Sequence, residues 1–147
     1  MIQLPSVFSD LLRSLNTHEV KYLVIGGYAV VYHGHPRMTG DIDIWVENSP
    51  ANAERISAAL NDFGFGTDSL APGTFTKDNQ IVRMGHPPFR VEVLTSPSGV
   101  DFATCYERRV EDELQGVPVR FISLRDLRQN KEASGRTKDL NDLEQLP

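Results

Sequence analysis

The stretch "GGYAVVYHGHPRMTGDIDIWVE", residues 26–47, contains the strongest structural signal in this sequence. Two glycines end an apolar run, and thirteen residues lie between Gly27 and Asp41. Two aspartates, Asp41 and Asp43, then flank one isoleucine within an apolar strand pattern. A buried carboxylate without a partner loses its hydration at a large cost in free energy. We therefore expect Asp41 and Asp43 to face a partner that neutralises them.

The composition is that of an ordinary globular chain, with 147 residues, 39% of them hydrophobic and 24% charged. This length predicts a single domain, residues 1–147. Because no apolar run reaches the ~18 residues that a membrane span needs, we expect no membrane partner. The single cysteine, Cys105, excludes an internal disulfide and predicts a cytoplasmic location. A net charge of −5 argues against indiscriminate nucleic-acid binding through bulk charge.

Hydrophobic periodicity predicts alternating helices and strands along the whole chain. Ser49 and Ser123 are expected to cap helices, and a hairpin is expected to turn at Gln115–Gly116. In the strand 89–94, Phe89 is expected to share the buried face of Val91 and Val93. Helices are predicted over 6–16, from just after Gly27 to near Gly34, over 50–63, around 100–107, after the cap at Ser123 to residue 134, and within 135–146. Strands are predicted over 22–25, 41–47, 81–84, 89–94 and 110–122, and residues 64–80 form a connector.

Carboxylates occur on one face of two of these strands. Asp41 and Asp43 lie about 7 Å apart on one strand face, at roughly 3.3 Å per residue, and Trp45 follows on that face. Glu92 has the same alternation on a later strand. If the strands are neighbours, three carboxylates converge and repel one another unless cations neutralise them. Oxygen ligands of this kind suit Mg²⁺, two ions of which support in-line attack on phosphorus; Mn²⁺ is an alternative.

The glycine pair fits the same site. Gly26 and Gly27 end one strand and open a helix, where glycine lets the backbone approach a phosphate closely. The stretch is therefore expected to hold a nucleoside triphosphate on one side and metal on the other. An EF-hand is excluded, because Trp45 and Val46 occupy positions that need a ligand and a glycine. A Walker-A loop and a dinucleotide-binding glycine motif are both absent.

At these residues the sequence resembles the nucleotidyltransferase superfamily, which shares the DNA polymerase β-like catalytic fold. That family combines a Gly-Gly or Gly-Ser, ten to fourteen residues, an Asp-x-Asp and a third acid on a later strand. The third acid is often Asp, whereas here it is Glu92, assigned by alternation alone. More narrowly, the sequence is similar to small bacterial nucleotidyltransferase-like proteins related to abortive-infection and toxin–antitoxin transferases. Arg37 and Thr39 match an Arg-x-Thr element of that group.

The C-terminal stretch "NKEASGRTKDLNDLEQL", residues 130–146, resembles the same group through Lys131, Arg136, Asp139 and Asp142. The resemblance implies that Lys131 and Arg136 contact phosphate. Gly135 breaks the helix between them, and Asp139 is placed to hold Arg136 through paired hydrogen bonds. We also expect Leu140 and Leu143 to anchor the last helix in the core. The alternative for the whole basic region is a solvated helix face.

The resemblance implies an α+β fold, a small mixed β-sheet with helices packed on one face. It implies a metal-dependent enzyme that moves a nucleoside monophosphate from a triphosphate to a hydroxyl acceptor. Asp41, Asp43 and Glu92 would be both catalytic and metal-binding, with two Mg²⁺ ions as cofactors. The nucleotide-binding residues would be Gly26, Gly27, Arg37, Thr39, Lys131 and Arg136.

Two rival interpretations stay open at this point. The first is a catalytically silent binding module of the same fold, acting as a toxin–antitoxin partner or regulator. The second is a glycosyltransferase using Asp-x-Asp, for which the chain is short. The acceptor, whether an RNA 3′ end, a protein or a small molecule, is not specified by the sequence, and neither are the nucleotide and the oligomeric state. His33 and His35 lack further ligands at zinc-site spacing and are expected to be loop residues.

Overall fold

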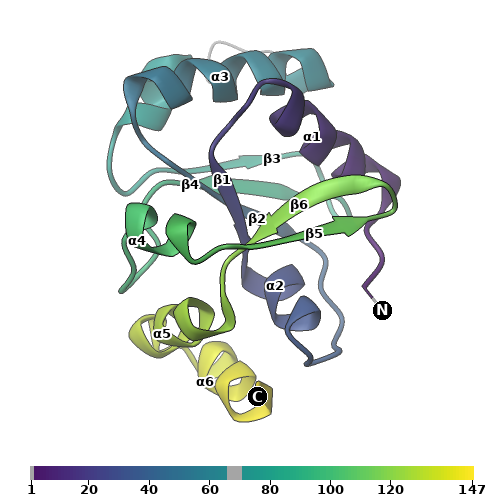
Figure 1. Ribbon diagram of the computed structural model, residues 1–147, viewed down its shortest axis with the longest axis vertical. Coiled ribbons are helices and arrows are strands. Elements are labelled where there is room, and N and C mark those ends of the chain that lie inside the picture. Colours follow the sequence, from purple (N-terminus) through teal and green to yellow (C-terminus); the bar gives the residue numbers. More distant parts are fainter. Residues whose placement is uncertain (1, 66–70) are drawn as a thin grey trace.

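The computed structural model describes residues 2–65 and 71–147. Its centre is a mixed six-stranded sheet in the order β3-β4-β2-β1-β6-β5 (Figure 1). β1 pairs antiparallel with β2 and parallel with β6, and β2 pairs parallel with β4. The predicted α+β class and mixed sheet are confirmed. The strands are β1 (Tyr22–Ile25), β2 (Ile42–Val46), β3 (Ile81–Met84), β4 (Val91–Leu94), β5 (Val110–Leu114) and β6 (Val117–Phe121).

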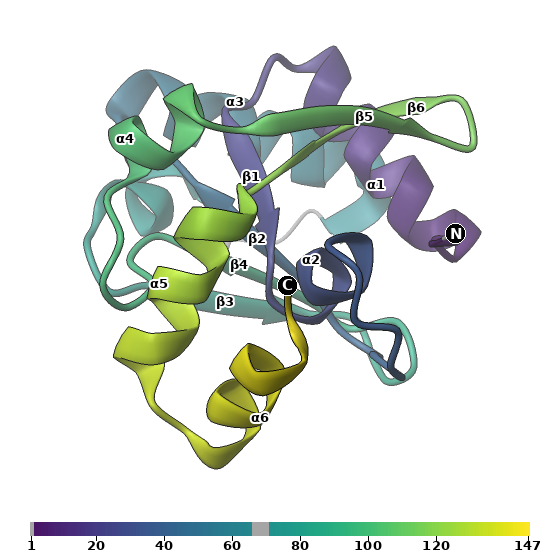
Figure 2. The same cartoon turned by 60° about the horizontal axis from the view of Figure 1, so that its bottom comes forward.

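Helices lie on both sides of this sheet, not on one face as expected, because ion pairs hold the C-terminal helices on the second side. α1 and α3 lie above the strands in Figure 1, while α5 and α6 lie below them. Figure 2 shows α5 and α6 side by side, close to α2. The sheet face that bears the aspartates is therefore partly covered by the C-terminal helices. The helices are α1 (Ser6–Thr17), α2 (Gly26–Tyr32), α3 (Pro50–Leu60), α4 (Phe102–Glu107), α5 (Leu124–Ser134) and α6 (Thr137–Gln145).

The core is built from the alternation seen in the sequence. Ile42, Ile44 and Val46 of β2 are fully buried, as are the strand residues Val91 and Val93 of β4. The helix α1 supplies its expected stripe to the same core. Burying each large apolar side chain contributes about 1.5–3 kcal/mol, so this layer supports the sheet on which the carboxylates lie. The α1 stripe consists of Phe8, Leu11, Leu12 and Leu15.

The turn and capping residues lie where the sequence placed them. The hydroxyls of Ser49 and Ser123 accept hydrogen bonds from backbone N–H groups in the first turns of α3 and α5. The hairpin of β5 and β6 turns at Gln115–Gly116, and both residues have positive φ. Gly135 ends α5 in the left-handed conformation, with φ 66°. This bend directs α6 back toward the sheet.

Three local expectations need correction. Phe89 lies in the turn before β4 and is 45% exposed, so it is not part of the buried strand face. Leu140 does not anchor α6, because it is 47% exposed, and Leu143 is only half-buried. The buried side chains of α6 are instead two aspartates, Asp139 and Asp142. The apolar pattern predicted the wrong buried face of α6, because ion pairs of Asp139 and Asp142 hold this helix in place.

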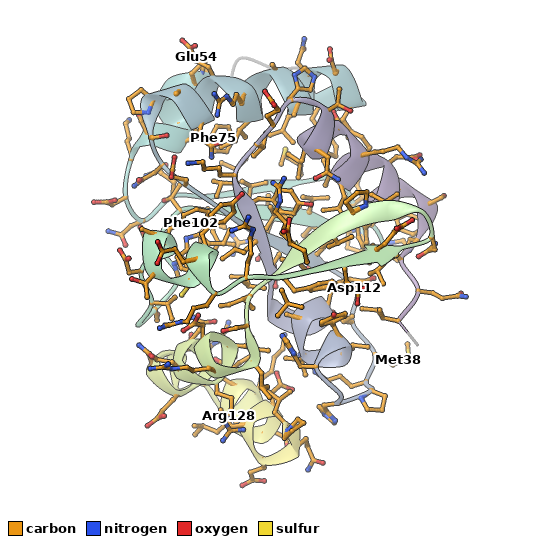
Figure 3. All side chains as sticks on the ribbon, in the orientation of Figure 1. Met38, Glu54, Phe75, Phe102, Asp112 and Arg128 are labelled. Atoms are coloured by element: carbon orange, nitrogen blue, oxygen red, sulfur yellow. The ribbon has the colours of Figure 1, made fainter. Side chains whose placement is uncertain are left out.

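The predicted connector, residues 64–80, contains more structure than its composition suggested. Residues 66–70 lie outside the described part of the chain. A short 3₁₀ helix, η3 (Pro72–Thr76), buries Phe75 completely, and Phe75 lies beneath α3 in Figure 3. The segment therefore contributes to the core before β3 begins. Among the described helices, none is long and apolar enough to cross a membrane.

Candidate active site

The glycine pair lies where β1 ends and α2 begins. Gly26 has φ 66°, and a Cβ at this position would overlap Oδ2 of Asp43. A Cβ on Gly27 would overlap Oγ1 of Thr39. The register explains the first contact, since Ile25 is paired with Asp43 across β1 and β2. The glycines thus make room for the side chains of the site itself, a role that the sequence did not reveal.

Asp43 and Glu92 lie opposite each other on the adjacent parallel strands β2 and β4. Burial, followed by the hydrogen bond to Glu92 and the charges of Glu92 and Asp41, raises the pKa of Asp43 to about 7. Burial also opposes ionisation of Glu92, but hydrogen bonds from Arg83 and Asp43 outweigh it and lower the pKa of Glu92. Asp43 therefore keeps its proton to higher pH than an exposed aspartate does, and its protonated form hydrogen-bonds to Glu92.

Two arginines neutralise the acids of the site. Arg83 Nε donates to Glu92 Oε1 at 2.8 Å, and the two residues are paired across β3 and β4. Arg90 Nη1 lies 3.9 Å from Asp41 Oδ2. Asp41 precedes β2, and its side chain is half-exposed. In the protein alone, Glu92 and Asp41 are thus each paired with a guanidinium group, while Asp43 is hydrogen-bonded to Glu92.

The three predicted acids share one hollow. Asp41, Asp43 and Glu92 all line a cavity of about 370 Å³. A second cavity, of about 480 Å³, shares Asp43 and Glu92 and extends to α5 and the start of β3. Within residues 2–65 and 71–147, however, no group of three His, Cys, Asp or Glu side chains is already arranged around a metal position. Asp43 and Glu92 are in contact, while Asp41 lies at the rim with Arg90.

A buried ion cluster joins the predicted cations to α6. Arg37 donates to both carboxylate oxygens of Asp142, at 2.9 and 3.0 Å. Lys131 Nζ lies 3.0 Å from Asp142 and 3.1 Å from Asp139. Arg136 completes the cluster with two hydrogen bonds to Asp139, at 2.7 and 3.3 Å. The cluster joins the loop after α2 to both C-terminal helices.

The cluster leaves a net positive charge beside the acids. Burial raises the pKa values of Asp139 and Asp142, but hydrogen bonds from the surrounding cations outweigh it and lower both. Three cations then face two carboxylates. Lys131 is only 4% exposed and its ammonium is occupied by both carboxylates, whereas Arg136 is mostly exposed. The hydrogen-bonded pair expected between Asp139 and Arg136 is present.

Several residues outside the sequence-based set also line the site. Lys138 and Arg83 line both cavities, and the positive charge of Lys138 acts to lower the pKa of Asp43. Arg83 had a usable signal, because the register of the β3–β4 hairpin places it opposite Glu92. For Lys138, the sequence offered only its positive charge. No pattern placed it in the site, because its position depends on the bend at Gly135.

Other side chains singled out in the sequence have structural roles. Trp45 is buried, donates from Nε1 to the carbonyl oxygen of Thr95, and packs edge-to-face against Phe102 of α4. A ring nitrogen of His33 lies 2.7 Å from the carbonyl oxygen of Ile122. Burial raises the pKa of the Cys105 thiol to about 12, which makes it a poor nucleophile.

A mixed sheet with an acid pair on adjacent strands beside a glycine turn is the arrangement of a nucleotidyltransferase-type domain. The chain belongs to the family described as "Nucleotidyltransferase of unknown function (DUF6036)", whose model matches residues 3–146. The superfamily expected from the sequence is thereby confirmed. No curated protein matches the chain significantly.

Two solved structures share the fold. A Thermotoga maritima protein described as a "putative nucleotidyltransferase" has a TM-score of 0.63 at 17% identity, covering 95% of this chain and 89% of that one. An antigenic nucleotidyltransferase-like protein from Paracoccidioides brasiliensis has a TM-score of 0.56 at 16% identity, covering 95% of this chain and 73% of that one. At such identities the similarity concerns the fold alone.

Proposed function

We propose that this protein is a Mg²⁺-dependent nucleotidyltransferase that transfers a nucleoside monophosphate from a nucleoside triphosphate to a hydroxyl acceptor. The observation that supports this most directly is the Asp43–Glu92 pair on adjacent strands, with Asp41 at the rim of the same hollow. Carboxylates of this kind repel each other when ionised. In the protein alone, the hydrogen bond between Asp43 and Glu92 and the ion pairs with Arg83 and Arg90 reduce this repulsion. A divalent cation bound to these carboxylates can replace both the hydrogen bond and the arginine ion pairs.

The donor set fits Mg²⁺. All three acids offer oxygen ligands, and Mg²⁺ is commonly held by one or two carboxylates together with substrate phosphates. The ionised form of Asp43 would bind the cation, and Glu92 would exchange its bond to Arg83 for it. Bound there, Mg²⁺ would supply charge stabilisation for the phosphates and lower the pKa of an attacking hydroxyl.

The residues of the chain have separable roles in this proposal. The acceptor hydroxyl attacks the α-phosphorus, the bond to the β-phosphate oxygen breaks, and pyrophosphate leaves. A carboxylate oxygen of Glu92 accepts the hydroxyl proton. Gly26 and Gly27 leave space for the side chains of Asp43 and Thr39 and border the cavity that would take the triphosphate. Arg136 and Lys138 provide exposed cations for it. Arg37, Thr39 and Lys131 form the wall behind it, with Arg37 and Lys131 contributing positive charge.

The test is transfer itself. Each nucleoside triphosphate, labelled at the α-phosphate, is incubated with the protein, Mg²⁺ and total RNA or protein, and label incorporation and pyrophosphate release are measured. Mn²⁺ is tested in parallel. Asp41→Asn should abolish transfer without unfolding the chain, while Asp10→Asn, an exposed acid on α1, should leave transfer unchanged. Undiminished transfer by folded Asp41→Asn protein contradicts the assignment.

A silent binding module is the second candidate, and one observation favours it. The ion pairs of Arg83 with Glu92 and of Arg90 with Asp41 already neutralise acids that metal would need. Such a module, acting for example as a toxin–antitoxin partner, would not release pyrophosphate from a nucleoside triphosphate. The same incubations separate the two candidates, because only the enzyme consumes the triphosphate.

A further inference from the structure

An apolar ledge lies next to the carboxylates on the same sheet face. Ile81 is paired with Leu94 across β3 and β4, two residues along from the Arg83–Glu92 pair. Side chains two residues apart on a strand share a face, at a spacing of roughly 7 Å. On this face, the charged pair Arg83–Glu92 is therefore followed directly by the apolar pair Ile81–Leu94. We use "the ledge" for Ile81 and Leu94.

The ledge is open to the larger cavity. Ile81 and Leu94 both line the 480 Å³ cavity that also contains Asp43 and Glu92. Ile81 is 54% exposed, whereas Trp45, one strand further on the same row, is buried against Phe102. A single exposed isoleucine on a surface needs no explanation. An exposed isoleucine paired with a second apolar side chain inside a polar cavity offers a flat contact surface for a ligand.

Uncharged hydrogen-bonding groups surround this end of the cavity. Asn79 and Gln80 lead into β3, and their backbone N–H groups are fixed by the hydroxyls of Ser96 and Thr95, each at 3.0 Å. Among the described residues, neither side-chain amide donates or accepts a hydrogen bond within the protein. On the far side, Asn130 Nδ2 donates to the carbonyl oxygen of Ser98 at 2.9 Å and ties α5 to this wall.

We propose that the ledge is the nucleobase subsite of the transferase. The base packs on Ile81 and Leu94, and the amide of Gln80, with that of Asn79, bonds its edge. The triphosphate then lies over Asp43 and Glu92. The spacing of roughly 7 Å between the apolar pair and the charged pair leaves room for the ribose. Amide side chains suit this task because they offer both a donor and an acceptor to a base edge.

This inference rests on the proposed function, so its test compares a nucleotide with a base-free probe. Binding of Mg²⁺ with ATP, GTP, CTP or UTP, and of Mg²⁺ with inorganic tripolyphosphate, is measured by calorimetry on the full chain. Ile81→Ala should weaken the best nucleotide about 10-fold, or about 1.4 kcal/mol, and leave tripolyphosphate unchanged. Leu140→Ala is the matched control, since Leu140 is similarly exposed but lies on α6, and it should change neither affinity.

Gln80 is tested by selectivity. The wild-type protein should bind the four nucleotides with different affinities. Gln80→Ala should reduce these differences, while Gln145→Ala, which changes an exposed amide on α6, should preserve them. Equal affinity of the wild type for tripolyphosphate and for every nucleotide overturns the subsite but leaves the transferase standing. Parallel loss of both probes in Ile81→Ala also overturns the subsite. If the wild type binds neither probe, the proposed function fails and the subsite fails with it.

Discussion

Asp43 and Glu92 are register partners on parallel strands, so their two carboxyl groups lie together in one cavity. In the adjacent parallel strands β2 and β4, residues with the same alternation lie side by side. The two acids are therefore neighbours once both strands bury their apolar faces. The arrangement costs stability when both groups ionise. In the proposed enzyme, a bound cation would remove this repulsion between the two carboxylates.

The first prediction concerns Asp43→Asn and pH. Because the folded protein raises the pKa of Asp43 from 3.8 to about 7, the native state binds the proton more tightly than the unfolded chain. Stability from this group is therefore lost as pH rises from about 4 to about 7. Without metal, Asp43→Asn should be more stable than wild type by on the order of 2–4 kcal/mol at pH 8, and nearly equal below pH 4.

Urea unfolding with a chelator present, at several pH values, measures this difference. Asp10→Asn is the control and should stay within about 0.5 kcal/mol of wild type. A constant difference between Asp43→Asn and wild type over the whole pH range would show that Asp43 does not hold the extra proton.

The second prediction concerns the glycine pair. Gly26→Ala would place a methyl group against Asp43 in a backbone with φ 66°, so the variant should lose roughly 1–3 kcal/mol of unfolding free energy. Gly40→Ala is the matched control from the same stretch, because a Cβ there meets nothing within 4 Å. Chemical denaturation of both variants checks this. Equal stability of the two variants would mean that the Gly26 turn tolerates a side chain.

The sequence predicted the elements of the site better than their contacts. Alternation located Asp43 and Glu92 correctly on one face, because burial of Ile42, Ile44 and Val93 determines which way a strand faces. It did not predict that α6 is held by buried aspartates, because a helical pattern identifies an apolar stripe and not an ionic one. Leu140 was misplaced for that reason, and Lys138 was missed because its position depends on the bend at Gly135.

The last prediction concerns Lys131, whose burial no sequence pattern revealed. Its ammonium bridges Asp139 and Asp142 inside the protein, so Lys131→Ala would leave two nearly buried carboxylates partly unpaired. Breaking a buried ion pair by removing one partner costs about 3–5 kcal/mol, whereas Arg13→Ala, which breaks the exposed pair with Asp10, should cost less than about 1 kcal/mol. Lys131→Arg should recover part of the loss. Thermal and urea unfolding of the three variants measure these costs. If Lys131→Ala unfolds like wild type but binds Mg²⁺ and triphosphate at least 10-fold more weakly, Lys131 contacts phosphate directly and the ion cluster is not what holds α6.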